Sequence, residues 1–391
     1  MNKTSPLLSI IIPTKDRYNY LFEVLITLSD YVWSKNDVEI VIQDNSLDNI
    51  EIINFLNKKH KITQIIRYFH SNESLSQAGN SNLATLNARG EYLCFIGDDD
   101  CIHKDIIRAV KWMKENKYEI LNNTKPEFIW SDLTPTRLGD SFSGMLFSYS
   151  YSGSSKIKRS DIQLKKHLKT GGQYIKNLPQ FYHGIVKKSL LDKIYEESGT
   201  YFPGPSPDMA VATALTKYSD FFVVVDFPLI ISGKGARSVG GMGAKGKHIG
   251  DIRDISFLPK DTADKWTTDI PFYWSGSTIF AESVIKSLNN TNREALVDNF
   301  NFNYLYARCL VFDSKYKKDI ITAHKKNKNS SLLLVYFYFV KIWIKRIKIF
   351  VINRSILKKL TKLVYHFNVN NIKEAIKILN SETKKIKAPW I

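Results

Sequence analysis

The chain has 391 residues, of which 43% are hydrophobic and 13% aromatic, and this composition excludes an intrinsically disordered protein. Its three cysteines are an odd number without metal-ligand spacing, which argues against a disulfide framework and favours a reducing, cytoplasmic setting. The formal net charge is +18, and nineteen Lys or Arg against three acids between residues 314 and 391 account for +16 of it.

Strands and helices are predicted to alternate at short intervals over the first hundred residues. Apolar runs predict strands at 9–14, 38–42, 65–69 and 92–96, and helical spacing predicts helices at 20–31, 50–59 and 77–88. Such alternation is typical of βαβ units with a mainly parallel sheet covered on both faces. Ligands bind such sheets beyond the carboxyl ends of the strands. Because Asp16, Asp44 and residues 98–100 follow strand ends, we expect them to share one crevice.

Three consecutive aspartates, Asp98, Asp99 and Asp100, follow Gly97 at the end of a predicted buried strand. Like charges at a strand end repel each other, and a hard divalent cation such as Mg²⁺ or Mn²⁺ would compensate them while holding the phosphates of a substrate. Taken alone, this short pattern fits a solvated acidic turn equally well.

The pattern between residues 104 and 250 is less regular. It predicts a helix at 104–116, a strand at 127–132, a long surface loop at 134–160, an apolar stretch and helix at 180–193, a Pro/Gly-rich turn at 201–208, a helix at 209–218 and a strand at 221–227. Residues 232–250 contain seven glycines with Lys234, Arg237, Lys245 and Lys247 between them. This composition predicts a flexible, cationic loop.

The C-terminal tail carries nine uninterrupted apolar residues, 332–340, followed by a mixed apolar and basic stretch to 352. A helix needs about twenty apolar residues to cross a hydrocarbon core, so this run is too short to span one. Lys341, Lys345 and Lys348 fall on one helical face, which favours an amphipathic helix in an anionic membrane interface. The alternative is a helix packed on the body with a solvated basic face. Nucleic acid is disfavoured as a partner because the cations alternate with aliphatic and aromatic runs.

Several segments of the first 230 residues or so resemble bacterial family 2 glycosyltransferases with the GT-A fold. Residues 9–17, Ser-Ile-Ile-Ile-Pro-Thr-Lys-Asp-Arg, are similar to the family's first strand and nucleotide-binding turn. Residues 41–48 resemble its second-strand motif, and residues 80–100 resemble the helix, turn and strand that lead to its metal-binding DXD motif. The resemblance implies a Rossmann-like, mainly parallel mixed sheet with helices on both faces, followed by a mostly helical C-terminal region.

The resemblance also implies roles for residues at the strand ends. It implies that the nucleotide contacts are Pro13, Thr14, Asp16, Asp44, Asp98 and Asp99. It implies that Asp100 binds Mn²⁺ or Mg²⁺ directly and that Asp98 assists. The acceptor oxygens of Asp16 and Asp44 suit a uracil edge or ribose hydroxyls, and the alternative for both is a turn or capping role.

The family places a catalytic base about a hundred residues after the DXD motif, at the start of a helix, and the matching residue is Asp208. The motif departs here from the more common Glu-Asp form, and an ordinary N-cap aspartate is the alternative. His183 is a candidate for the acceptor pocket, with a purely structural histidine as the alternative. Lys234 and Arg237 are candidates for contacting the diphosphate, with an ordinary surface loop as the alternative.

The resemblance thus implies a metal-dependent, inverting glycosyltransferase that moves a hexose from a nucleotide-sugar, a UDP-sugar, to a saccharide acceptor. Enzymes resembling this chain often extend O-antigen or capsule units on a polyprenyl diphosphate, so we expect a peripheral enzyme on the cytoplasmic face of the cell membrane. The expected domains are 1–250 (nucleotide half 1–132, acceptor half 133–250), a helical extension at 251–313 and the basic tail at 314–391. The alternative function is a non-catalytic carbohydrate-binding or scaffolding protein on the same fold.

Overall fold

The computed structural model of the chain describes all residues except 1–4, 59, 135–141, 247 and 355–362. Its largest sheet is mixed and has eight strands in the order β3-β2-β1-β4-β10-β6-β11-β9. The neighbours from β3 to β4 are parallel, whereas β10 runs antiparallel between β4 and β6. The strands of this sheet are β1 (Leu8–Thr14), β2 (Val38–Asp44), β3 (Ile66–His70), β4 (Tyr92–Phe95), β6 (Ile120–Asn123), β9 (Ser155–Arg159), β10 (Gly184–Lys187) and β11 (Phe221–Val225).

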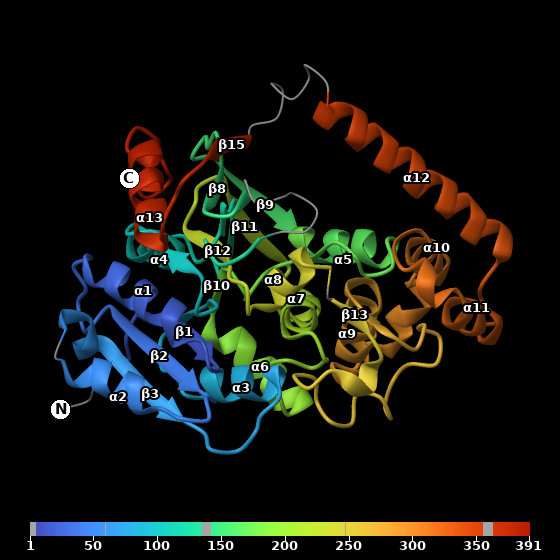
Figure 1. Ribbon diagram of the computed structural model, residues 1–391, viewed down its shortest axis with the longest axis horizontal. Coiled ribbons are helices and arrows are strands. Elements are labelled where there is room, and N and C mark those ends of the chain that lie inside the picture. The colour runs from blue at the N-terminus through green and yellow to red at the C-terminus, as the bar shows by residue number, and fades with distance from the viewer. Residues whose placement is uncertain (1–4, 59, 135–141, 247, 355–362) are drawn as a thin grey trace.

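Helices cover both faces of this sheet, because alternate residues of its central strands point to opposite sides. Ile10 and Ile12 pack with α1, α2 and α4 in one core, and Ile11 packs with α3, α6 and α7 in another. These helices are α1 (Tyr18–Ser29), α2 (Ile50–Asn57), α3 (Gln77–Leu86), α4 (Ile106–Glu115), α6 (Lys188–Ser198) and α7 (Pro207–Tyr218). The predicted α/β fold with helices on both faces is confirmed (Figure 1).

A second sheet of five strands has the order β15-β8-β7-β12-β5. Its strands are β5 (Cys101–Ile102), β7 (Glu127–Ile129), β8 (Met145–Tyr149), β12 (Ile230–Lys234) and β15 (Leu363–His366). Since β4 ends at Phe95 and β5 begins at Cys101, the acidic run forms the connection between the two sheets.

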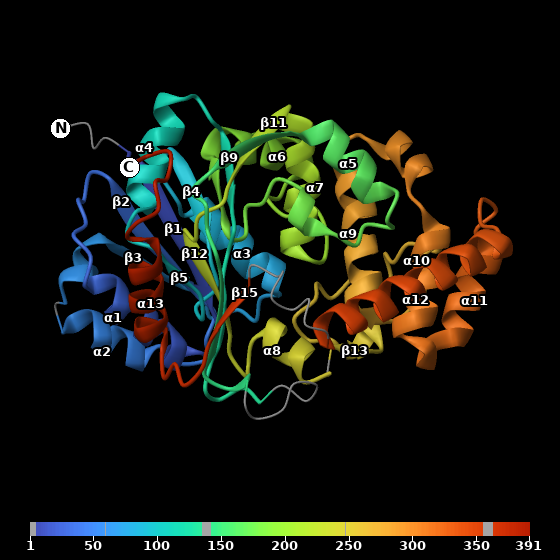
Figure 2. The same ribbon diagram turned by 90° about the horizontal axis from the view of Figure 1, so that it is seen from above.

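The region after residue 250 is mostly helical, as predicted, and it encloses a separate core. Its helices, with the earlier helix that joins them, are α5 (Ser160–Leu168), α9 (Gly276–Asn290), α10 (Phe302–Phe312), α11 (Lys317–Lys326) and α12 (Leu332–Arg354). Figure 2 shows these helices beside the sheets, with α7 between the two parts. Met209 and Ala212 of α7 belong to this core, so α7 contributes to both sides.

The last part of the chain returns to the first domain. β15 pairs antiparallel with β8, and α13 (Ile372–Thr383) packs beside α1. Ile372, Ala375, Ile376 and Leu379 of α13 have helical spacing and are buried in the same core as α1. Residues 363–391 therefore pack with the first domain, whereas the charge pattern assigns them to the basic tail.

Three local predictions differ from the structure. The expected loop at 134–160 contains β8 and β9, and the helix expected within 180–193 begins at Lys188, after β10. The expected cationic loop at 232–250 contains the end of β12, the short helix α8 (Val239–Ala244) and β13 (Ile249–Gly250), which pairs with β14 (Trp274–Ser275). For β9 and β10, pairing with β11, β4 and β6 outweighs local sequence pattern. Gly184 allows the start of β10 to lie close to the backbone of Gln180, because a Cβ at residue 184 would lie 2.0 Å from the carbonyl oxygen of Gln180.

We expect Leu379→Ala to lower the free energy of unfolding by about 2–5 kcal/mol, because the side chain is fully buried between α13 and the sheet. Urea unfolding of the full chain measures this loss. Lys377→Ala, on the exposed side of the same helix, is the matched control and should change stability by less than about 0.5 kcal/mol. Equal stability of Leu379→Ala and the unchanged protein would contradict the packing of α13 in this core.

Candidate functional site

The side chains at the carboxyl ends of the parallel strands meet at one edge of the large sheet, as predicted. Thr14 ends β1 and pairs in register with Asp44, the last residue of β2. The Thr14 hydroxyl donates a 2.6 Å hydrogen bond to Oδ2 of Asp98, which follows β4. This bond fixes the acidic run beside the end of the first strand.

The three consecutive carboxylates are buried, so a solvated acidic turn is excluded. Asp98 and Asp100 have no exposed surface, and Asp99 is 3% exposed. Burying charged groups is unfavourable unless they find partners. The three aspartates differ in the partners that stabilise their buried charges.

Asp98 is paired with a cation from the turn before α1. Nη2 of Arg17 lies 2.9 Å from Oδ1 of Asp98, although the same oxygen accepts no hydrogen bond within the described residues. Burial raises the pKa of Asp98 above its ordinary value, while Arg17 and Thr14 act in the opposite direction. Asp98 thus keeps one buried oxygen that is incompletely satisfied.

Asp100 is held by four donors from three parts of the chain. Oδ2 accepts from the backbone N–H of Gly97 at 2.6 Å, from Tyr182 at 3.1 Å and from His183 at 2.6 Å, and Oδ1 accepts from the N–H of Gly233 at 2.8 Å. Burial alone would raise the pKa of Asp100, but His183 and the backbone donors outweigh it and hold the pKa below its usual value. Both oxygens of the predicted direct metal ligand are therefore engaged by protein donors.

His183 connects Asp100 to a lysine that the sequence analysis does not identify. Nζ of Lys125 lies 2.8 Å from Nδ1 of His183. Because an ammonium group only donates, Nδ1 accepts, and the ring proton is on Nε2, which donates to Asp100. Burial lowers the pKa of His183, which favours the neutral ring, and lowers the pKa of Lys125 to about 8. His183 has a left-handed backbone with φ +62°, a conformation that costs free energy in a residue other than glycine.

Lys125 follows β6, whose carboxyl end lies at the same edge as that of β4. The sequence signal for it is therefore the same as for the aspartates, a polar residue just beyond a strand. That signal is missed because β6 ends in Asn122 and Asn123 and lacks a long apolar run.

Asp99 has the least compensation of the three aspartates. One carboxylate oxygen accepts a 3.0 Å bond from the N–H of Gly235, and the backbone carbonyl accepts from Trp130. Burial and the charge of Asp100 raise the pKa of Asp99 to about 7, although Arg17 opposes them. A cation beside Asp99 would relieve this repulsion.

The described residues contain no group of three or more His, Cys, Asp or Glu side chains that could by itself hold a metal ion. Mg²⁺ is commonly held by one or two carboxylates together with substrate phosphates and water, so fewer protein ligands suffice. The incompletely satisfied oxygen of Asp98 and the uncompensated charge of Asp99 fit such an ion, whereas the occupied oxygens of Asp100 do not.

Asp16 and Asp44 differ in how far they are available to a ligand. Asp44 is fully buried and accepts from the hydroxyls of Tyr18 and Tyr68 at 2.5 and 2.8 Å. Asp16 is exposed, with φ +54°, and one of its oxygens accepts a 3.1 Å bond from the N–H of Leu47. Asp44 therefore orders the wall of the site, and Asp16 faces outward at its rim.

Asp208 is the second residue of α7, and the N-cap is Ser206, so the alternative of an N-cap aspartate does not hold. Its Oδ1 accepts from the Ser206 hydroxyl at 2.5 Å and the N–H of Met209 at 2.8 Å, and Oδ2 has no hydrogen-bond partner among the described residues. The charge of Asp208 acts on both Lys125 and His183. The structure thus brings Asp208 to the same side as the acidic run.

Lys234 and Arg237 both have protein partners. Lys234 forms an ion pair with Glu127 of the neighbouring strand. Nη2 of Arg237 donates to the side chain of Asn19, and its guanidinium lies 6.0 Å from the ring centroid of Tyr20. Their predicted contact with a diphosphate would require these partners to be exchanged.

Comparison with known proteins finds similarity over the part of the chain that carries this edge. Residues 9–163 match the model described as glycosyl transferase family 2. An uncharacterized glycosyltransferase of Rickettsia felis is 35% identical over 111 residues, which are 28% of this chain and 18% of the relative. Poly(ribitol-phosphate) beta-N-acetylglucosaminyltransferase TarS of Staphylococcus aureus is 20% identical over 228 residues, 56% of this chain and 39% of TarS. The chain thus spans less than half the length of either relative.

The solved structure of S. aureus TarS residues 1–349 in complex with UDP-GlcNAc aligns with a TM-score of 0.47 and 16% identity. The alignment covers 81% of this chain and 79% of that one.

We expect Gly233→Ala to lower the free energy of unfolding by about 1–3 kcal/mol, because the new Cβ would lie 1.7 Å from the carbonyl oxygen of Asp99. Urea unfolding measures the change. Gly276→Ala is the matched control, since a Cβ there meets nothing within 4 Å, and it should change stability by less than about 1 kcal/mol. A Gly233→Ala protein as stable as the Gly276→Ala protein would contradict the close approach of β12 to the acidic run.

Proposed function

We propose that this chain, whose residues 9–163 match the model of glycosyl transferase family 2, is an inverting hexosyltransferase that moves a sugar from a UDP-linked donor to a saccharide acceptor. The observation that carries the proposal is the buried run of three aspartates at the carboxyl edge of the parallel strands, with Asp208 acting on the same charged groups. The name of the relative TarS, an N-acetylglucosaminyltransferase, supports transfer of a sugar.

Two acids serve the nucleotide in this proposal. Exposed Asp16, beside Pro13 and Thr14, accepts hydrogen bonds from the base or ribose, because a carboxylate offers acceptors only. Buried Asp44 holds Tyr18 and Tyr68 in position instead of contacting the donor with a free oxygen.

The cofactor is proposed to be Mn²⁺ or Mg²⁺, held by Asp99 and Asp98. This assignment moves the metal contact from Asp100, its predicted direct ligand, to Asp99, a predicted nucleotide contact, because the four donors around Asp100 leave it a positioning role. When bound, the ion stabilises the negative charge that develops on the departing diphosphate. Arg17 and Lys125 supply further positive charge at the same edge.

Asp208 is proposed as the general base. Its unpaired carboxylate oxygen takes the proton of the acceptor hydroxyl. At the same time the hydroxyl oxygen of the acceptor forms a bond to the anomeric carbon. The bond between the anomeric carbon and the diphosphate oxygen breaks on the opposite face, and its electron pair leaves with the nucleotide. The configuration at the anomeric carbon is inverted. Ser206 and the N–H of Met209 hold the other oxygen, so the carboxylate keeps a fixed direction.

The acceptor is proposed to be a saccharide carried on a polyprenyl diphosphate, as in O-antigen or capsule synthesis, with the enzyme on the cytoplasmic face of the cell membrane. The exposed apolar and cationic helix α12 supports a membrane-borne acceptor. No helix among the residues that the structure describes has the length and apolar character needed to cross a membrane.

A panel of UDP- and GDP-sugars tests the proposed donor and metal. We expect a UDP-sugar to raise the thermal unfolding temperature only when Mn²⁺ or Mg²⁺ is present, because a ligand that binds the folded state stabilises it. Slow hydrolysis of the same donor, abolished by EDTA, should accompany binding. Failure of every nucleotide-sugar to bind with either metal would favour the non-catalytic carbohydrate-binding or scaffolding alternative.

Asp208→Asn should lower kcat for sugar transfer by about 10²–10⁴-fold, because the amide cannot accept the proton. Donor binding, measured by calorimetry, should stay within about twofold of the unchanged protein. Asp161→Asn is the matched control, since Asp161 is the second residue of α5 and an exposed acid in its first turn. Near-normal transfer by Asp208→Asn would contradict the assignment of the base.

A further inference from the structure

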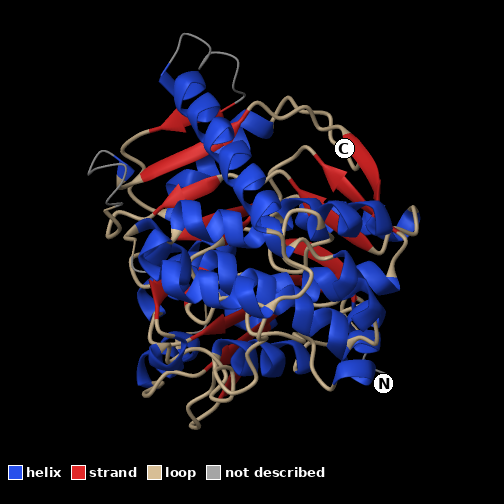
Figure 3. Ribbon diagram, turned by 90° about the vertical axis from the view of Figure 1, so that its right-hand side faces the viewer, coloured by secondary structure: helices blue, strands red, loops and turns tan. Residues whose placement is uncertain are grey.

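Helix α12 presents a continuous apolar surface on the outside of the molecule. Figure 1 shows α12 at the outer edge, beyond α10, and Figure 3 shows it crossing the surface of the helical part. Its inner side is packed, since Val335 and Ile342 are buried and Tyr338 and Phe339 contact the helical core. Most of the other apolar side chains that the structure describes in this helix are exposed.

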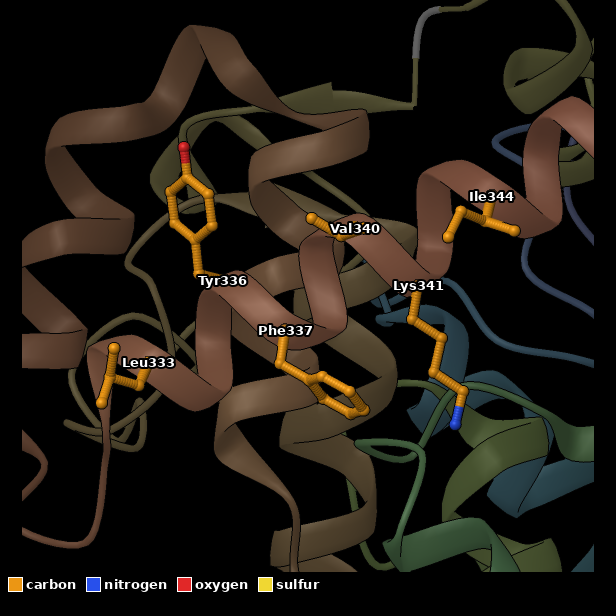
Figure 4. Close-up of a pocket in the computed structure, with 6 residues that line it drawn as sticks. All are labelled: Leu333, Tyr336, Phe337, Val340, Lys341 and Ile344. Atoms are coloured by element: carbon orange, nitrogen blue, oxygen red, sulfur yellow. The ribbon is translucent and has the colours of Figure 1, made fainter.

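Eight of the twelve exposed apolar residues that the structure describes in α12 lie within an arc of about 120°, at about 100° per residue, on the side away from Val335 and Ile342. These are Leu333, Tyr336, Phe337, Val340, Trp343, Ile344, Ile347 and Val351. Figure 4 shows side chains of this set along α12. We call this set the outer face of α12. Leu332, Leu334, Ile349 and Phe350 are exposed outside this arc.

Cations border the outer face on one side. The same rotation puts Lys348, Lys341 and Lys345 next to it, between the outer face and the packed side. Nζ of Lys341 lies 5.9 Å from the ring centroid of Phe337, so its aliphatic stem follows the apolar surface. Residues 332–354 contain no acid. The arrangement matches an anionic partner with an apolar interior.

α12 lies between two packed parts of the chain. Before it, α10 and α11 belong to the helical core. After it, β15 pairs with β8 and α13 packs beside α1. A surface bound by the outer face would therefore hold the whole body in one orientation, unlike a surface bound by a free tail.

We propose that α12 lies in the plane of an anionic membrane leaflet, with its outer face among the acyl chains and Lys341 and Lys348 at the lipid phosphates, whereas Lys345 contacts the ring of Tyr174. An apolar face with aromatic residues and flanking lysines is the pattern of interfacial helices. Protein surfaces usually present both positive and negative groups, whereas residues 332–354 contain cations and no acid. The inference deepens the proposed function and rests on its membrane-borne acceptor, because it assigns the contact with the membrane to one helix face.

Flotation of the full chain with vesicles tests the proposal. We expect binding to vesicles of phosphatidylcholine with phosphatidylglycerol, weaker binding to phosphatidylcholine alone, and release at high salt. Leu333→Glu combined with Ile344→Glu should lower binding at least tenfold, since these side chains are 83% and 61% exposed. Lys341→Gln and Lys348→Gln should each lower binding to anionic vesicles about fivefold.

The matched controls are Val32→Glu and Ile157→Glu, which make the same kind of change at residues that are 102% and 60% exposed elsewhere. Both should float like the unchanged protein. Flotation of the Leu333→Glu, Ile344→Glu variant at the unchanged level would overturn the proposal. The proposal would also be overturned if light scattering found the unchanged protein to be a dimer that binds no vesicles and the double variant to be a monomer. The outer face would then cover a second copy of the chain.

The outcome is separable from the proposed function. Each variant is also tested for binding of a UDP-sugar with Mn²⁺ in the absence of vesicles. Retained donor binding with lost flotation supports the membrane role of α12, and lost donor binding with normal flotation counts against the proposed function alone.

Discussion

The interaction on which the site depends is the compensation of three consecutive buried carboxylates. They form the connection between the two sheets, so the partners come from both. Thr14 and Arg17 reach Asp98 from the end of β1, His183 reaches Asp100 from the start of β10, and β12 supplies backbone donors. A buried charge without partners would be strongly destabilising. The packing of β12 against the acidic run is therefore a condition for the two sheets to meet as they do.

The compensation is uneven, and its unevenness indicates what each acid can do. Asp100 has enough donors to remain ionised without any ligand, and Lys125 fixes the histidine that serves it. The carboxylate of Asp99 has one donor, the backbone N–H of Gly235, and a raised pKa. If every buried carboxylate had enough donors and cations around it, a further cation would have nothing to neutralise. The Asp99 carboxylate lacks such partners, so a cation beside it would be favourable. In the proposed function, structural and ligand-binding roles are thus divided within three successive residues.

The sequence predicted the strands β1 to β4 because strands buried on both faces are continuous apolar runs. It also predicted that Asp16, Asp44 and the acidic run share one sheet edge. It missed β6, β8 and β9, whose pairing partners are distant in the chain, and with β6 it missed Lys125. It could not predict that both oxygens of Asp100 have protein donors, because these include His183 and Gly233, more than eighty residues away.

The return of α13 to the sheet has a consequence for biosynthesis. The core around β1 contains residues from Leu8 to Ala388, and His103 bonds Thr383 across 280 positions of the chain. Domains generally fold as units while the chain emerges from the ribosome, N-terminal parts first. Here the first domain lacks part of its core until residues 369–388 are made, so the helical part can fold first. Until that segment emerges, the nascent α/β domain therefore exposes apolar surface to which chaperones have access.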